Sequence, residues 1–310
     1  MRVLVTGATG FVGREVVRRL REARHEVRMV VRNEHAPAVA SLVSESKVEV
    51  MRGDVLKPDS LRAVASGVEA AIHLVGIISE CGNSTFENVH AGATRTMVAM
   101  AQLGRVKRFV QMSALGTRAG AVSRYHQTKW QAEEAVRKSG LDYTIFRPSL
   151  VYGPEDHFVN LYAGMIRWLP VVPVLGGRRT LFQPVHVSQV AAAIVGSLGN
   201  RGSIGQGFDI CGPERMTLSE IIARILVAMD RRRMVMRIPD GLARVQAGML
   251  EWVFPKLLRR PPPLSRDQLL MLQEDNIGDG KPADDLFGLR HPGFLQGITE
   301  YLAGNQTSMP

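Results

Sequence analysis

Cysteine is almost absent from this chain of 310 residues, which contains only Cys81 and Cys211. The two lie far apart in the sequence and lack the paired spacing of a zinc site or a redox motif. Both are therefore expected to be reduced thiols in a reducing compartment, and no metal site is expected.

Long apolar runs are also missing. The longest apolar passages, residues 161–175 and 190–198, are short or are interrupted by Arg167, Pro170 and Pro173, whereas a membrane-spanning helix needs about 20 apolar residues. A strand-like run starts at residue 3 with no apolar signal stretch before it. We therefore expect a cytoplasmic protein without a transmembrane helix.

Acidic residues are fewer than basic ones, 29 against 39, and aromatic residues are few. The formal net charge is +10, and aromatic residues make up 6% of the chain. This excess would permit anionic partners, but the arginines are spread along helices, as between Arg14 and Arg24, without the interleaved aromatic residues of a nucleic-acid platform. Solvated helix faces are expected, and no nucleic-acid partner.

The first half alternates short apolar strands with helical patterns. Val12, Val16, Val17 and Leu20 share one helical face, and residues 97–103 repeat apolar side chains at helical spacing. Such alternation predicts a parallel sheet with right-handed crossovers, which is the doubly wound α/β architecture of the Rossmann type. The expected strands are 3–6, 27–31, 48–51, 70–75, 108–112 and 143–146.

Two domains are expected, because proline and glycine become more frequent after Pro148. The Rossmann domain is predicted over residues 1–150, with 181–212 returning to it. Residues 151–180 and 213–310 are predicted to form a smaller, interwoven domain that covers the substrate.

Three local signals place elements in the second half. A strand at 183–187 and a helix from Ser188 are expected to return to the main sheet. The capping boxes Thr217–Glu220 and Ser265–Gln268 each predict the start of a helix.

The first strand runs into the turn Gly7-Ala-Thr-Gly10-Phe-Val-Gly13 and then directly into a helix. Glycine permits the tight turn and the close approach of a pyrophosphate, whose negative charge is stabilised by the free N–H groups and the dipole of the helix. The turn therefore predicts a dinucleotide site with candidate contacts at Gly7, Thr9, Gly10, Phe11, Val12 and Gly13.

Arg32 follows the second strand, at the position where NAD-preferring proteins carry Asp or Glu. A guanidinium there offers paired donors to a 2′-phosphate, so NADP(H) is favoured over NAD(H); the alternative is a solvated arginine at a strand end. After the third and fourth strands, further candidate cofactor contacts are Asp54, Val55, Leu74, Val75 and Gly76.

These motifs resemble the extended and atypical branch of the short-chain dehydrogenase/reductase superfamily. Its catalytic Tyr and Lys, four residues apart, match Tyr125 and Lys129 on an expected helix, where this spacing puts both on one face. The resemblance implies that Lys129 tunes the phenol of Tyr125 and holds the nicotinamide ribose, and that Ser113 hydrogen-bonds a substrate carbonyl. Pro148 and Val151 are further candidate cofactor contacts.

The likeness is strongest in segments 86–93, 143–154, 182–187 and 263–268, which are similar to the group around the nucleotide-binding accessory subunit of mitochondrial complex I and its bacterial relatives. That group implies a bound NADP-type dinucleotide, but not one reaction.

Nucleotide-sugar epimerases and dehydratases share the layout of this branch, yet Phe182 stands where they usually have a diphosphate-clamping arginine. The resemblance therefore favours oxidation or reduction of a lipophilic carbonyl or quinone-like substrate. Arg178 and Arg179 could replace the missing cation, so a sugar nucleotide stays open.

Residues 240–260 include apolar side chains at helical spacing, from Leu242 to Leu257, followed by Arg259 and Arg260. This segment predicts either a helix packed on the core or a partner, or a peripheral contact with the inner face of a membrane or with a respiratory or quinone-biosynthetic complex. A non-catalytic, dinucleotide-loaded assembly protein is accordingly the main alternative to an oxidoreductase; a redox-sensing regulator of the NmrA type is a weaker one.

Overall fold

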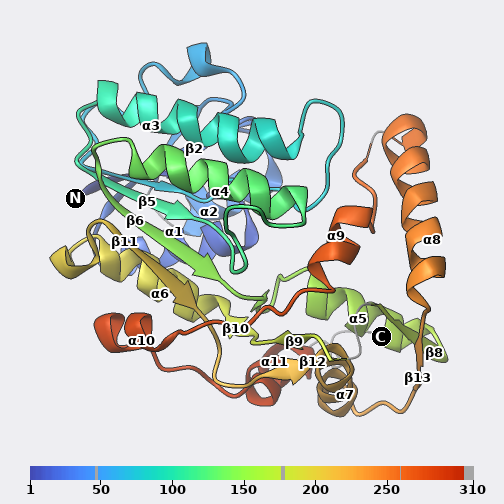
Figure 1. Ribbon diagram of the computed structural model, residues 1–310. Helices are drawn as coiled ribbons and strands as arrows, with labels where there is room; N and C mark the ends of the chain where they lie inside the picture. Colours follow the sequence, from blue (N-terminus) through green and yellow to red (C-terminus); the bar gives the residue numbers. More distant parts are fainter. Residues whose placement is uncertain (46–47, 176–178, 259, 304–310) are drawn as a thin grey trace.

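The computed structural model describes residues 1–45, 48–175, 179–258 and 260–303. A seven-stranded parallel sheet in the order β11-β6-β5-β4-β1-β2-β3 forms its centre (Figure 1). The order reverses direction on either side of β1, so the predicted doubly wound α/β fold is confirmed. The strands are β1 (Arg2–Thr6), β2 (Glu26–Val31), β3 (Val48–Arg52), β4 (Ala70–His73), β5 (Arg108–Met112), β6 (Asp142–Pro148) and β11 (Gln206–Ile210).

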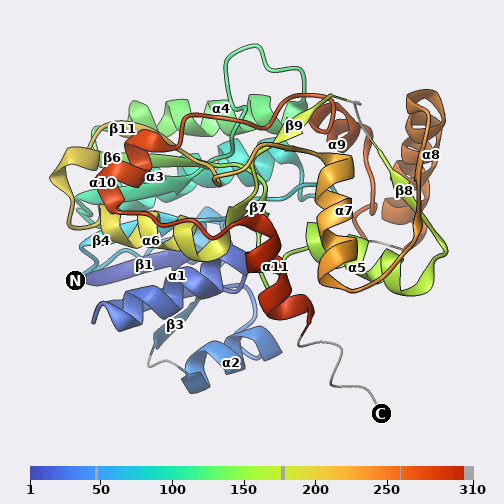
Figure 2. The ribbon, with the colours of Figure 1, turned by 90° about the horizontal axis from the view of Figure 1, so that it is seen from below.

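Helices cover both faces of the sheet. On one face α1 and α6 pack into a core that contains Val16, Val17 and Ile194, while α3 and α4 cover the other face with Met97 and Val136 (Figures 1 and 2). The bounds are α1 (Phe11–Glu22), α2 (Pro37–Glu45), η1 (Pro58–Leu61), η2 (Glu87–Gly92), α3 (Ala93–Leu103), α4 (Arg124–Arg137), α6 (Val187–Ser197), η3 (Arg201–Ser203) and α10 (Lys281–Phe287).

A second core lies beside the carboxyl ends of the sheet strands and is built from α5, α7, α11 and short strands. Tyr152, Phe182 and Phe294 are among its buried side chains. Its elements are β7 (Val151–Tyr152), α5 (Phe158–Trp168), β8 (Val171–Val174), β9 (Leu181–Phe182), β10 (Val185–His186), β12 (Met216–Thr217), α7 (Leu218–Ala228), β13 (Met234–Arg237) and α11 (Phe294–Leu302).

The two predicted capping boxes are confirmed. The Thr217 side chain accepts from the amide of Glu220 at the start of α7, and the Ser265 side chain accepts from the amide of Gln268 at the start of α9 (Arg266–Met271). Each N3 side chain returns the bond, so two otherwise unpaired donors are satisfied at each helix start.

The prediction that strand 183–187 joins the main sheet was wrong. Only Val185 and His186 are extended, and they pair with β7 outside the main sheet. The place beside β6 is taken by β11, whose Phe208 and Ile210 are buried in the main core. Pro184 has no N–H to donate to a strand ladder, and the extended pair Val185–His186 starts directly after it.

The helix expected in the apolar stretch 240–260 is present, and its large apolar side chains are not packed on the core of this chain. The stretch forms α8 (Asp240–Val253) and η4 (Phe254–Leu258), and Leu242, Val245 and Met249 are exposed. Leu103 at the end of α3 is exposed as well. Within the described ranges, no helix has the length and apolar character needed to cross a bilayer.

Gly13 offers a test of the packing between α1 and the turn before it. A Cβ at Gly13 would lie 2.1 Å from the carbonyl oxygen of Gly7, so Gly13→Ala must push the helix away from the turn. We expect a loss of about 1–3 kcal/mol in the free energy of unfolding, measured by urea denaturation.

Gly164→Ala in α5 is the matched control, because nothing lies within 4 Å of its added Cβ. It should be neutral or stabilising by about 0.5–1 kcal/mol. Equal stability of the two variants would contradict the packing argument.

Candidate functional site

A cleft of about 290 Å³ opens at the carboxyl ends of β1, β2 and β4. It is lined by nine of the candidate cofactor residues, which come from four separate loops: Gly7, Thr9, Gly10, Arg32, Asp54, Val55, Leu74, Val75 and Gly76. In doubly wound sheets ligands bind in such a crevice, where the strand order reverses.

The glycine turn shapes the inner wall of this cleft. Gly7 has a φ of +79°, and a Cβ there would lie 3.0 Å from the carbonyl carbon of Leu74. Gly10 is the N-cap of α1, and the helix has neither a side-chain cap nor an acidic residue in its first turn. Its first N–H groups and positive dipole end are therefore suited to a pyrophosphate.

The far end of the cleft is polar. Arg32 follows β2 and is exposed, while Asp54 follows β3 and accepts a hydrogen bond from the amide of Leu56 with Oδ1 at 3.0 Å. The cleft thus places one cation and one carboxylate at the end opposite the sheet centre.

Other candidate cofactor residues lie outside the lining of this cleft. Val12 is buried in the main core, and Gly13 packs on the turn. Phe11 lies against Gly153 on the other side of the turn. Pro148 ends β6, and Val151 starts β7.

Tyr125 and Lys129 lie one turn apart on α4, as their spacing predicts. The ammonium of Lys129 donates to the carbonyl oxygen of Met112 at 3.2 Å and lies 5.9 Å from the ring centroid of Tyr125. A Cβ on Gly76 would lie 3.0 Å from this nitrogen, so the ammonium borders the cleft floor. The structure therefore places the Lys129 ammonium behind the Gly76 wall of the cleft, with Tyr125 one turn earlier on the same helix; neither side chain is among the residues that line the cleft.

Ser113, the candidate partner of a substrate carbonyl, is buried beside α4. Its hydroxyl lies 3.4 Å from the hydroxyl of Thr117 and also hydrogen-bonds the carboxylate of Glu133. Across the described chain, no side chain hydrogen-bonds the hydroxyl of Tyr125, so Ser113 and Tyr125 are not in direct contact.

His90 connects the cleft floor to α4, and residue patterns alone did not single it out. Its Nδ1 lies 2.9 Å from Thr128 Oγ1, and its Nε2 lies 3.2 Å from the amide nitrogen of Ile77. Nε2 also lies 3.1 Å from the carbonyl oxygen of Ile77, so both ring nitrogens of His90 are within hydrogen-bond distance of a partner, and which of them donates depends on the tautomer. The available signal was its place in segment 86–93, one of the segments that carry the family likeness.

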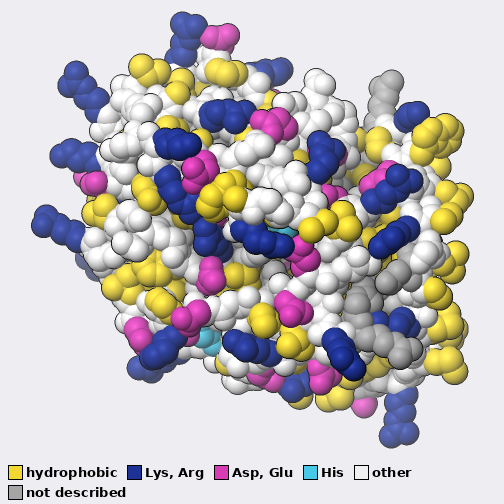
Figure 3. Space-filling view, viewed as in Figure 1, with side chains coloured by type: hydrophobic (Ala, Val, Ile, Leu, Met, Phe, Trp, Pro, Cys, Tyr) yellow, Lys and Arg dark blue, Asp and Glu magenta, His cyan; other side chains and the backbone are white. Residues whose placement is uncertain are grey.

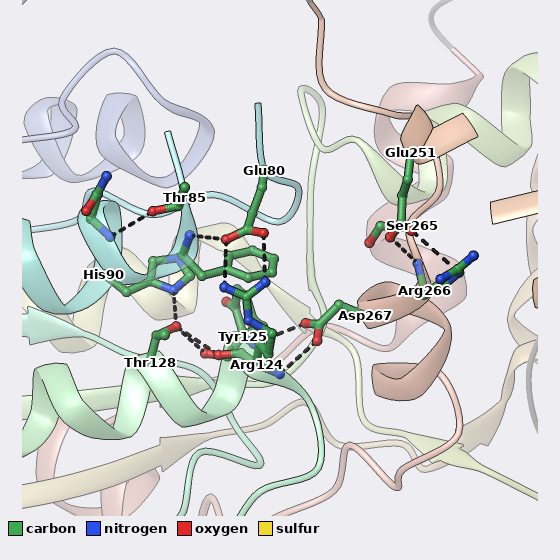
Figure 4. A network of polar contacts seen from close by, with 12 residues as sticks. Glu80, Thr85, His90, Arg124, Tyr125, Thr128, Glu251, Ser265, Arg266 and Asp267 are labelled. Carbon is green, nitrogen blue, oxygen red and sulfur yellow. Dashed lines mark hydrogen bonds and ion pairs between the residues drawn. The ribbon is translucent and has the colours of Figure 1, made fainter. Parts of the chain in front are cut away.

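A carboxylate from the C-terminal part caps the helix that carries Tyr125. Asp267 at the start of α9 accepts from the amides of Arg124 and Tyr125 at 2.7 and 3.0 Å (Figure 4). Arg124 in turn pairs with Glu80, whose other bond is from the amide of Phe86. Residues far apart in the sequence therefore meet around the first turn of α4.

The same network continues to α8. Glu251 accepts from the amide of Arg266 at 2.7 Å and forms an ion pair with its side chain at 3.6 Å (Figure 4). The capping box at Ser265 predicted the start of α9 from the sequence. The contact of Asp267 with Tyr125, 142 positions earlier, leaves no local signal.

The comparisons with known proteins agree with this geometry. A family model described as NAD(P)H-binding matches residues 7–162, from the first glycine of the turn to α5. The chain belongs to the NAD(P)H-binding family. The expectations of a dinucleotide-binding domain and of a likeness to the complex I accessory subunit are thereby confirmed.

Two curated relatives of this NAD(P)H-binding protein are named for different roles, one as a subunit of a respiratory complex and one as an enzyme. The mitochondrial NADH dehydrogenase (ubiquinone) 1 alpha subcomplex subunit 9 of Arabidopsis thaliana is 32% identical over 277 residues, which cover 88% of this chain and 68% of that protein. A ceramide reductase of Caulobacter vibrioides is 34% identical over 194 residues, covering 62% and 59%. Membership of the family therefore does not specify one activity.

A solved structure extends the fold likeness to nearly the whole chain. The UDP-glucuronic acid 4-epimerase of Bacillus cereus, in complex with UDP-glucuronic acid and NAD, superposes with a TM-score of 0.74 at 18% identity, covering 98% of this chain and all of that one. At this identity the likeness concerns the fold alone.

Burial is the main cause of the shifted pKa values of the titratable side chains near the cleft. It lowers the pKa of Lys129 to about 8, opposed by the negative charge of Glu133. Burial and the charge of Asp267 raise the pKa of Tyr125 to about 12. Burial and the Lys129 ammonium lower the pKa of His73 to about 3 and that of His90 to about 2. At neutral pH, Tyr125 is a neutral phenol between neutral imidazoles and an ammonium.

His73 ends β4 with one nitrogen unsatisfied. Its Nδ1 lies 2.6 Å from Thr6 Oγ1, whereas its Nε2 is buried without a hydrogen-bond partner among the described residues. Within those residues no group of histidines, cysteines and carboxylates could hold a metal ion.

Lys129 gives a prediction that is independent of catalysis. The folded pKa of about 8 lies below the ordinary 10.5, so the unfolded chain binds more protons between these values and stability rises with pH there. Replacing the buried ammonium in Lys129→Met should raise the free energy of unfolding of the cofactor-free protein at pH 7 by up to about 3 kcal/mol.

This gain should shrink as the pH rises through 8 towards 10.5, measured by urea unfolding across that range. The exposed Lys138 supplies the control, since Lys138→Met should change stability by less than about 0.5 kcal/mol. A Lys129→Met variant that is less stable than wild type at pH 7 would refute the buried-charge argument.

Proposed function

We propose that this protein is an NADP(H)-dependent oxidoreductase that acts on a lipophilic carbonyl or quinone-like substrate. The observation that supports this most is the position of Lys129, whose ammonium borders the cleft at Gly76 while Tyr125 lies one turn earlier on the same helix. The cleft residues fit the dinucleotide, because the first turn of α1 is uncapped and its glycines leave room for phosphate.

The bound nicotinamide would supply a hydride to the carbonyl carbon, or accept it in reverse. Tyr125 would donate its phenolic proton to the carbonyl oxygen, so that the products of reduction are the oxidised cofactor and an alcohol. Lys129 would return a proton to the tyrosinate and stabilise its negative charge. Ser113, held by Glu133 and Thr117, would need to turn its hydroxyl towards the substrate to polarise the carbonyl.

An apolar substrate is supported by the surroundings of Tyr125. Its ring meets the edges of Phe86 and His90, and His90 is neutral. Phe182, which stands where the epimerases usually have an arginine, is uncharged and is buried in the second core, so it cannot anchor a diphosphate. Arg179 is exposed, and Arg178 lies outside the described residues. The Caulobacter relative is named for a lipid substrate, which favours the same class.

A dinucleotide-loaded assembly protein is the second candidate. It is favoured by the Arabidopsis relative, whose name places it in a respiratory complex, and by the exposed apolar residues of segment 240–260. In that case the cofactor would stabilise the fold without reacting, and the segment would contact the complex or a membrane.

Tyr125→Phe separates these two candidates. Removing the phenolic proton should lower turnover by about 10²–10⁴-fold, measured as NADPH oxidation with long-chain ketones, aldehydes and quinones. Cofactor affinity should change little, because the ring remains. Tyr162→Phe, another buried tyrosine remote from the cleft, is the control. Unchanged turnover in Tyr125→Phe would refute the catalytic assignment and favour the assembly protein.

The cofactor preference depends on Arg32 in this proposal. Arg32→Glu should weaken NADPH binding by about tenfold or more, because a charge-assisted contact with the 2′-phosphate is worth roughly 1.5–3 kcal/mol. NADH affinity should stay equal or improve in calorimetric titration. Arg62→Glu, which changes an exposed arginine outside the cleft, is the control. Equal loss for both cofactors would argue against selection by Arg32.

A further inference from the structure

Large apolar side chains gather on one outer face of the molecule, which we call the α8 face. Figure 3 shows them as a nearly continuous band along the right edge, over α8 and the strands below it. Isolated apolar residues are normal on protein surfaces, but a contiguous set marks an interaction site. The exposed members are Trp168, Leu169, Met234, Met236, Leu242, Val245, Met249, Trp252, Leu257 and Leu258.

α8 turns its larger side chains outward. The buried residues of the helix are Ala243 and Ala247, which pack with Leu269 in a small cluster. Val245 and Met249, one turn apart, are 62% and 65% exposed. An ordinary surface helix buries its large apolar residues, so the outward face of α8 is shaped for contact with something outside this chain.

Cations dominate the same region. Residues 230–260 include eight arginines or lysines and three aspartates or glutamates. Arg232, Arg244 and Lys256 have no described carboxylate within ion-pair distance, and the Lys256 ammonium lies 5.0 Å from the ring centroid of Trp252. Glu251 is paired with Arg266, so its negative charge is already balanced by a cation of this chain. The exposed charge around the apolar side chains is therefore positive.

We propose that the α8 face docks on an anionic phospholipid bilayer. A helix of 14 residues is about 21 Å long, too short to span but long enough to lie in the interface with Val245, Met249 and Trp252 inserted among the acyl chains. Tryptophan and long cationic side chains suit the headgroup level, where the ring and the charge are both satisfied.

Charge distinguishes a bilayer from a second copy of this chain. A twofold interface brings the same patch of both copies together, so Arg232, Arg244 and Lys256 would meet their own counterparts without carboxylates between them. Anionic headgroups supply the missing negative charge at about 1 kcal/mol per cation. The face therefore fits an anionic lipid surface better than it fits itself.

Docking would place the cleft beside a source of lipophilic substrate, and this use of the face depends on the proposed function. The link runs from Glu251 on α8 to Arg266, and from Asp267 to the amide of Tyr125 (Figure 4). The docking surface and the first turn of α4 are thus joined through one short helix.

The test is co-sedimentation of the full chain with vesicles of phosphatidylcholine alone and of phosphatidylcholine mixed with phosphatidylglycerol. We expect binding to the anionic vesicles that weakens as salt is raised. The double variant Val245→Glu/Met249→Glu should bind more than tenfold more weakly, and each of Arg232→Gln, Arg244→Gln and Lys256→Gln about fivefold more weakly. Leu103→Glu, 73% exposed on α3, should bind as wild type does.

Thermal unfolding midpoints of the variants should match that of wild type, since all the altered side chains are exposed. Tyr125→Phe should sediment as wild type does, so loss of the reaction would count against the proposed function and not against docking. No binding to anionic vesicles, equal binding by the double variant, or a wild-type dimer in sedimentation velocity that the double variant abolishes would each overturn the proposal.

Discussion

The buried ammonium of Lys129 is the constraint on which the arrangement of the site depends. It is 3% exposed and donates to one described acceptor, the carbonyl oxygen of Met112. Glu133, one turn later on α4, is the nearest candidate for a counter-charge, but it is bound by Arg147, Arg137 and Ser113. These bonds hold the pKa of the Glu133 carboxyl below its ordinary value despite burial. Lys129 therefore lacks a counter-charge of its own, which lowers the free energy of unfolding. A lysine kept only for stability would not be buried in this way.

The two histidines, the glycine and the tyrosine that surround Lys129 add no second positive charge beside its ammonium. His73 and His90 are neutral because burial disfavours their protonated forms, and the Lys129 ammonium lowers their pKa values further. Gly76 has no side chain to block the path from the cleft to Nζ. Tyr125 keeps its proton because its burial disfavours the phenolate, and the negative charge of Asp267 at the start of its helix adds to this effect. The site thus holds one buried positive charge, on Lys129, and one phenolic proton, on the largely buried Tyr125.

Sequence patterns predicted the parts of this arrangement that are encoded locally. The first six sheet strands are short runs rich in apolar and β-branched residues, and the glycine turn needs φ above zero at Gly7 and close packing at Gly13, so both leave a direct signal. The Tyr125–Lys129 spacing places both residues on one helical face without further information. Local signals were insufficient for β11, because the competition between 183–187 and 206–210 for the edge of β6 is decided by packing. The same applies to Asp267 and His90, whose roles arise only when distant segments meet.

The contact between α9 and α4 makes the C-terminal part necessary for the geometry of the N-terminal one. The amides of Arg124 and Tyr125 are among the first of α4 and have no partner within the helix, so Asp267 satisfies two donors that would otherwise face the substrate region. Asp267 itself is positioned by a capping box at Ser265 and by Glu251, which anchors Arg266. Glu251 on α8 is thus connected to the first turn of α4 through two consecutive residues, Arg266 and Asp267. The hydrogen bonds in this connection are 2.7 to 3.0 Å long. The outer apolar helix α8 and the helix that carries Tyr125 are therefore connected through α9 by direct hydrogen bonds.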